Sequence, residues 1–72
     1  MNVITFIFKS LEDAHNLIGS KYIYNMIRDN EIVILFDPKL NEVSFKLLGD
    51  EEDNKRIYRG IVDLVEFYTY YD

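Results

Sequence analysis

This chain of 72 residues contains no cysteine, and that absence strongly constrains how it can fold. A chain of this length buries only about 60% of the surface that its unfolded form exposes, so its core is small. Disulfides and thiolate-bound metals, which usually supplement small cores, both need cysteine. Aromatic packing and association of subunits remain, and five Phe with six Tyr supply the rings. We therefore expect one compact domain over residues 1–72.

Three stretches rich in β-branched and aromatic residues predict strands. Residues 3–8 carry no charge, which predicts a strand that is buried on both faces at the centre of its sheet. Residues 31–36 and 42–48 form the other two, joined by a turn in which Pro38 takes the second position. Apolar and polar residues alternate in 42–48, so one face of this strand should be exposed to solvent. We place it at an edge, where Lys46 would hinder further pairing.

The segment between the first two strands is less certain. Ser10 is a good cap for a helix, and Gly19–Ser20 interrupts the helical propensity in its middle. Residues 21–28 fit either a strand, by the propensity of their tyrosines, or a helix. We prefer the helix, which places Tyr22 and Met26 on the core face of the preceding turns. Its opposite face then needs a second partner, which is consistent with a dimer.

The last third of the chain predicts a clear amphipathic helix. Asp50 suits the cap position after Gly49. Apolar residues then recur with the spacing of one helical face, at Ile57, Ile61, Leu64, Val65 and Tyr68. The predicted order is β-α-β-β-α in the α+β class: a three-stranded, mainly antiparallel sheet with two helices packed on one face.

Charge limits the partners of the protein. The net charge is −5, from 8 basic and 13 acidic residues, whereas binding to nucleic acid requires neutralisation of phosphates by basic groups. Direct binding to nucleic acid or to an anionic membrane is therefore disfavoured, and a basic surface of another protein is the better partner. No apolar stretch approaches the roughly 20 residues of a membrane helix, and the start lacks the basic region of a signal peptide. We expect a cytoplasmic protein.

No group of residues predicts catalysis. His15 is the only histidine, and Glu12 is the only acid near it on the same helical face. The serines occupy positions with structural roles, and the glycines are too scattered to form a phosphate-binding loop. We expect no catalytic residue, no cofactor and no metal. A small enzyme or metal-binding domain built on His15 is the least favoured interpretation.

The residues expected to bind a partner lie on the last helix and at its end. Lys55, Arg56 and Arg59 neutralise the middle of the exposed face, so negative charge concentrates towards its two ends. The first acids also fit a simpler role, opposing the helix dipole, and Phe67 and Tyr71 could instead complete the core. The candidate partner-binding residues are Asp50, Glu51, Glu52, Asp53, Asp63, Glu66, Phe67, Tyr70, Tyr71 and Asp72.

In its size, its lack of Cys and Trp, its excess of acid and its clusters Asp50–Asp53 and Glu66–Asp72, the chain resembles the small acidic proteins that phages make early in infection. Some of those imitate the charge of DNA and block host DNA-binding or replication proteins. The resemblance implies a non-enzymatic inhibitor that occupies the basic, nucleic-acid-binding surface of such a protein. The alternative is a structural or regulatory homo-oligomer whose C-terminal aromatic helix makes the subunit contact. A homodimer is expected.

Overall fold

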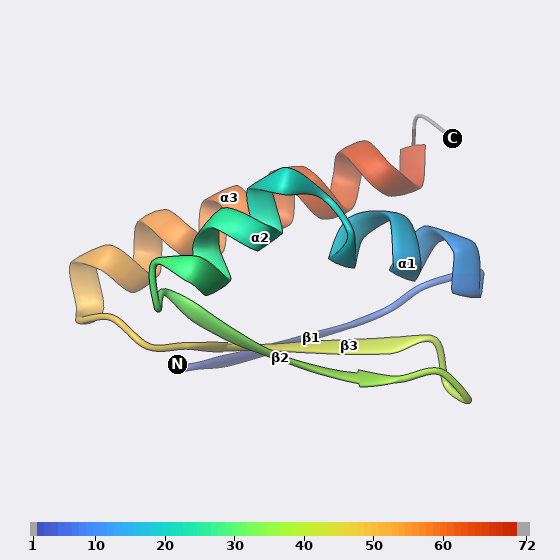
Figure 1. The fold of residues 1–72 in the computed structure, drawn as a ribbon, viewed down its shortest axis with the longest axis horizontal. Coiled ribbons are helices and arrows are strands. Elements are labelled where there is room, and N and C mark those ends of the chain that lie inside the picture. Colours follow the sequence, from blue (N-terminus) through green and yellow to red (C-terminus); the bar gives the residue numbers. More distant parts are fainter. Residues whose placement is uncertain (1, 71–72) are drawn as a thin grey trace.

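The computed structural model describes residues 2–70, except for the side chain of Tyr70. Its fold is α+β, as the sequence predicts, but it contains three helices where two were expected. Figure 1 shows the helices together on one side of a three-stranded sheet. In chain order the elements are β1 (Val3–Ile7), α1 (Leu11–Ile18), α2 (Lys21–Arg28), β2 (Ile32–Asp37), β3 (Glu42–Leu47) and α3 (Glu51–Tyr70).

The sheet is antiparallel, and its strand order is β1-β3-β2. The predicted positions of two strands are therefore wrong: β3 is central, and β1 lies at an edge. The prediction placed the least polar strand at the centre. However, Val3, Thr5 and Ile7 of β1 are exposed, and only its alternate residues face the core. Lys46 lies on the open face of the central strand and does not protect an edge.

The extra helix arises at Gly19–Ser20. The Ser20 side chain accepts a hydrogen bond from the Ile23 backbone N–H at 3.3 Å, so it caps a new helix and does not continue the old one. Residues 21–28 are thus helical, as preferred, and Met26 packs against the core as predicted, but the placement of Tyr22 on the core face is wrong. Ile23 is fully buried and Tyr22 is exposed, because the new helix starts in its own direction.

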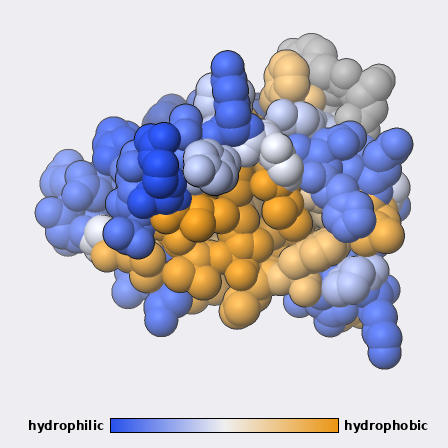
Figure 2. Space-filling view, viewed as in Figure 1, coloured by the Kyte–Doolittle hydropathy of each residue, from blue (hydrophilic) through white to orange (hydrophobic). Residues whose placement is uncertain are grey.

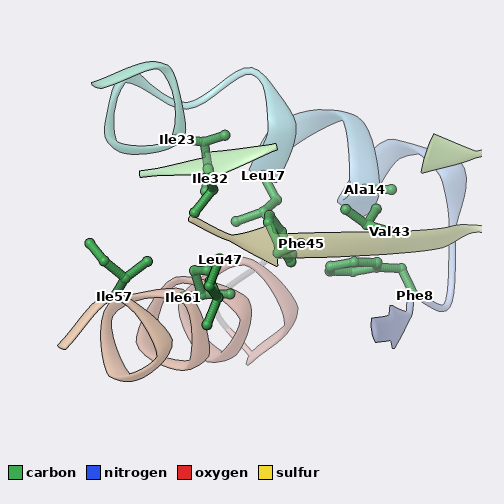
Figure 3. Close-up of a cluster of buried hydrophobic side chains, with 10 residues drawn as sticks. All are labelled: Phe8, Ala14, Leu17, Ile23, Ile32, Val43, Phe45, Leu47, Ile57 and Ile61. Atoms are coloured by element: carbon green, nitrogen blue, oxygen red, sulfur yellow. The ribbon is translucent and has the colours of Figure 1, made fainter. Parts of the chain in front are cut away.

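The core lies between the helices and the inner face of the sheet. Phe45 of β3 is completely buried, and Figure 3 shows Leu17 of α1 and Ile61 of α3 pointing towards it from different helices. Ile4 and Phe6 of β1 pack against the margin of this cluster. The buried apolar residues are Phe8, Ala14, Leu17, Ile23, Ile32, Val43, Phe45, Leu47, Ile57 and Ile61.

Local hydrogen bonds confirm several predicted ends of elements. The Asp13 backbone N–H donates to the Ser10 hydroxyl at 3.1 Å, which caps α1. The Leu40 N–H donates to the Asp37 carbonyl at 3.2 Å, so Pro38 occupies the second position of the turn between β2 and β3. The Asp53 N–H donates to Asp50 Oδ1 at 2.9 Å at the start of α3.

The junction between β3 and α3 contains a contact that the sequence did not reveal. Asn54 is buried, and its Oδ1 accepts a hydrogen bond from the Gly49 N–H at 3.0 Å. A Cβ at Gly49 would lie only 2.9 Å from Cβ of Asp53, so glycine permits this close approach. The junction fixes where α3 leaves the sheet, and with it the position of the acidic residues on that helix.

Candidate protein-binding site

The first acidic cluster of α3, Asp50–Asp53, is largely engaged within the chain. Asp50 caps the helix through its side chain. Glu51 lies 4.0 Å from Lys55, and Asp53 lies 3.7 Å from Arg56. The interpretation as helix-capping and dipole-opposing acids therefore accounts for most of this cluster.

Arg56 also pairs outside its own helix. Its Nη2 lies 3.3 Å from Oε2 of Glu31, which precedes β2. The pair links α3 to the start of the second strand. Glu52 is exposed and makes no ion pair with any residue from 2 to 70.

The second half of α3 presents the other predicted residues. Asp63 and Glu66 are exposed, and no ion pair among the described residues involves either carboxylate. The Phe67 side chain is 55% exposed, and its ring lies edge-on to that of Tyr68 at a centroid distance of 5.1 Å. The Tyr70 side chain, Tyr71 and Asp72 lie outside the described residues. The predicted surface therefore reduces here to Asp63, Glu66 and Phe67.

Beside these residues, α2 and α3 enclose an apolar groove of about 360 Å³. Gly60 lies within the lining of the groove, and a Cβ placed there would be 3.6 Å from Cε of Met26. Asp63 contributes a carboxylate to an otherwise apolar surface. The groove is lined by Tyr22, Met26, Gly60, Asp63, Leu64 and Phe67.

The α2 side of this groove was not predicted from the sequence, because Tyr22 was assigned to the core. One signal could have located it: Gly60 leaves a gap in the side chains of an otherwise strong helix. Tyr22 also has a cation beside it, since Nζ of Lys21 lies 5.5 Å from the centre of its ring.

A second, wider hollow of about 1080 Å³ runs along the other flank of α3. Tyr58, Arg59, Asp63 and Glu66 contribute to its lining. Asp63 lines both hollows, so it stands on the ridge between them. The ridge combines apolar surface with a carboxylate that forms no ion pair within residues 2–70.

The groups that could support catalysis have structural contacts. The His15 ring packs edge-on against Phe36 at a centroid distance of 5.5 Å. The hydroxyls of Ser10 and Ser20 cap helices, and the Ser44 hydroxyl lies 2.8 Å from that of Thr5. Within residues 2–70, no three His, Asp or Glu side chains come together as a metal site would require.

Comparison with known proteins assigns the chain to no group: no family model, no curated protein and no solved structure matches it. None of the helices in the described part of the chain combines the length and apolar character needed to cross a membrane.

Proposed function

We propose that this protein is a non-enzymatic protein-binding module that inhibits a DNA-binding or replication protein by occupying its basic surface. The observation that carries the proposal is the apolar groove between α2 and α3, with the carboxylate of Asp63, which forms no ion pair within the described residues, at its edge. Such a groove fits an apolar side chain that projects from a surface rich in Lys or Arg.

The groove would bind an apolar side chain of such a partner. Interfaces draw most of their binding energy from a few side chains that enter well-packed pockets. Met26 and Leu64 offer apolar contact, and the rings of Tyr22 and Phe67 add flat surfaces for a partner side chain. A volume of about 360 Å³ accommodates one large apolar side chain together with its flanking atoms.

The acidic side chains beside the groove would orient the bound partner. Asp63 and Glu66 have no ion-pair partner among the described residues, so both can pair with cations of a bound protein. The net charge of −5 would also steer a basic partner towards the protein before contact. A basic surface that binds DNA phosphates is then blocked, because the same Lys and Arg side chains cannot serve both ligands.

A capture experiment with matched variants tests the site. Immobilised wild-type protein should retain a basic protein from cell lysate, and retention should weaken as salt rises because the charges are exposed. Asp63→Lys and Phe67→Asp should each abolish retention. Glu12→Lys makes the same change of charge as Asp63→Lys on the exposed surface of α1 and should preserve most of it. Equal retention by all three variants would contradict the proposed site.

Gly60→Leu tests the groove without changing charge. The added side chain would occupy the groove, while replacement of a helical glycine favours the helix by roughly 0.5–1 kcal/mol. The variant should therefore remain folded, by circular dichroism, yet bind the captured protein at least tenfold more weakly. Undiminished binding would show that the groove is not used.

Inhibition itself is tested with the captured protein and labelled DNA. Added wild-type protein should displace the DNA in proportion to its occupancy, and Asp63→Lys should not. A ternary complex that contains DNA, partner and this protein together would contradict the inhibitory role.

The second candidate function is a structural or regulatory homo-oligomer joined through the aromatic end of α3. The exposure of Phe67 favours it. Sedimentation distinguishes the two candidates: Phe67→Asp should convert an oligomer of this type to monomers. An oligomer that survives the substitution is not built through that residue.

A further inference from the structure

The outer face of the sheet, on the side away from the helices, has a regular arrangement of side chains. The register places Val3, Lys46 and Val33 in one row across the strands. Thr5, Ser44 and Leu35 form the next row, and Ile7, Glu42 and Asp37 form the third. We call these nine residues the outer face.

Four of the nine outer-face residues are apolar, and all four lie on the two edge strands. Ile7 is 74% exposed and Leu35 is 67% exposed, the highest values among the large apolar side chains of the described residues. Val3 and Val33 are exposed as well. These apolar side chains flank the central strand, whose outer-face residues Lys46, Ser44 and Glu42 are polar.

Charge divides the outer face into two ends. Lys46 lies in the first row, and the carboxylates of Glu42 and Asp37 lie in the third. None of the three takes part in an ion pair within the described part of the chain. The face therefore has a basic end and an acidic end, and at the acidic end Asp37 Oδ1 accepts a hydrogen bond from the Lys39 backbone N–H at 3.0 Å.

We propose that the outer face binds the outer face of a second copy of this chain, related by a two-fold axis that runs across the strands through the row of Thr5, Ser44 and Leu35. This inference goes beyond the proposed function and does not depend on it. The rotation places Lys46 over Glu42 of the second copy, and Glu42 over its Lys46. Leu35 then meets Leu35, Val3 meets Ile7, and Val33 meets Asp37.

Charge selects this axis over the alternative. A two-fold axis along the strands would place Lys46 over Lys46 and Glu42 over Glu42, which like-charge repulsion disfavours. The row on the chosen axis also tolerates burial, because the Thr5 and Ser44 hydroxyls already form a hydrogen bond of 2.8 Å with each other.

The size of the outer face limits the expected strength of dimerisation. Three strands spaced about 4.8 Å apart, five residues long at about 3.4 Å per residue, cover roughly 15 by 17 Å. That is smaller than the footprint of a stable interface, which buries about 800 Å² per partner. We therefore expect a weak, reversible dimer that forms only at high protein concentration.

A dimer paired through the sheet edges is a separate arrangement, and sedimentation of charge variants distinguishes it from pairing of the outer faces. Both β1 and β2 are edge strands. In a dimer joined edge to edge through either strand, the two β3 strands would lie about 14 Å apart, at three strand spacings. Lys46 and Glu42 would then not meet across the interface, and exchanging their charges would have little effect.

Sedimentation equilibrium of charge variants tests the proposal. Wild-type protein should dimerise, whereas Lys46→Glu alone and Glu42→Lys alone should weaken dimerisation at least tenfold. An equimolar mixture of the two single variants should form heterodimers, because each acidic face then meets a basic one. The double variant Lys46→Glu/Glu42→Lys should regain dimerisation.

Controls separate charge complementarity from general effects. Lys55→Glu makes the same change of charge on the exposed side of α3 and should leave dimerisation intact. Circular dichroism should show that every variant is folded. A monomeric wild type at 1 mM, or a dimer that is insensitive to the exchange of charge, would overturn the proposal. A dimer disrupted only by Phe67→Asp would assign the interface to α3 instead.

Discussion

The two faces of the sheet are built from the same three strands, yet the environments of their apolar side chains differ. On the inner face, Phe45 is fully buried beneath the helices. On the outer face, Leu35 of the neighbouring strand is 67% exposed. The difference is imposed by the helices, which cover one side only in Figure 1. Apolar composition alone does not tell which face of such a strand is the core.

The exposed apolar surface is not confined to the outer face. Figure 2 shows apolar side chains gathered in the middle of the molecule, over β2 and the helix beside it. Ile27 of α2 and Val33 of β2 are exposed. A chain with so small a core leaves apolar side chains exposed at its margins. On the outer face of the sheet, these exposed side chains lie in regular rows across the strands.

The largest expected effect belongs to the centre of the inner face. Phe45→Ala should lower the free energy of unfolding by about 3–5 kcal/mol, because it removes a buried ring and leaves a cavity. Urea denaturation followed by circular dichroism measures the loss. If that variant does not fold, Phe45→Leu should show a smaller loss in the same direction. A loss below 1 kcal/mol for Phe45→Ala would contradict the position of the core.

The sequence predicts where helices and strands lie along the chain better than it predicts which of them lie next to each other in the fold. The alternation of Val43, Phe45 and Leu47 correctly identified the side of β3 that faces the core. The position of β3 at the centre was not predictable in this way, because strand order depends on which edges the chain connections allow to meet. The uncharged run of β1 suggested burial on both faces, but no second layer covers its outer side.

A smaller effect is expected from the polar pair in the middle of the outer face. Thr5→Ala and Ser44→Ala, measured singly and together, should give a coupling energy of about 0.2–1 kcal/mol for this cross-strand pair. The value is small because water can replace the bond between exposed hydroxyls. Measurements in dilute solution keep the chain monomeric. A coupling above 2 kcal/mol would indicate that this row is buried even in the monomer.

The smallest effect is expected for Leu35→Thr. In dilute solution, this substitution should change the free energy of unfolding by no more than about 0.5 kcal/mol, since Leu35 is mostly exposed and Thr favours strands. At high concentration the same substitution should weaken dimerisation. Thermal melts at two protein concentrations measure both results. A loss comparable with that of Phe45→Ala would remove the distinction between the two faces.

The candidate binding site was only partly predictable. Asp63 and Glu66 lie on the surface, as their helical positions indicate, whereas for Phe67 the sequence left a core position open and the side chain is 55% exposed. The groove beside them was not foreseen, because it depends on the direction of α2, and that direction is set by the capping hydrogen bond of Ser20. The Ser20 side chain thus determines which face of the eight-residue helix α2 packs against the core.

The central position of β3 also governs the order of assembly. The hairpin of β2 and β3 closes locally, across the turn at Pro38, whereas Thr5 and its partner Ser44 are 39 residues apart in the sequence. Loop closure over that distance costs more chain entropy, so we expect β1 to join late in folding. During synthesis β1 emerges first but has no partner strand until β3 follows. A nascent chain that stalls before Glu42 therefore exposes an unpaired apolar strand, which makes it prone to aggregate.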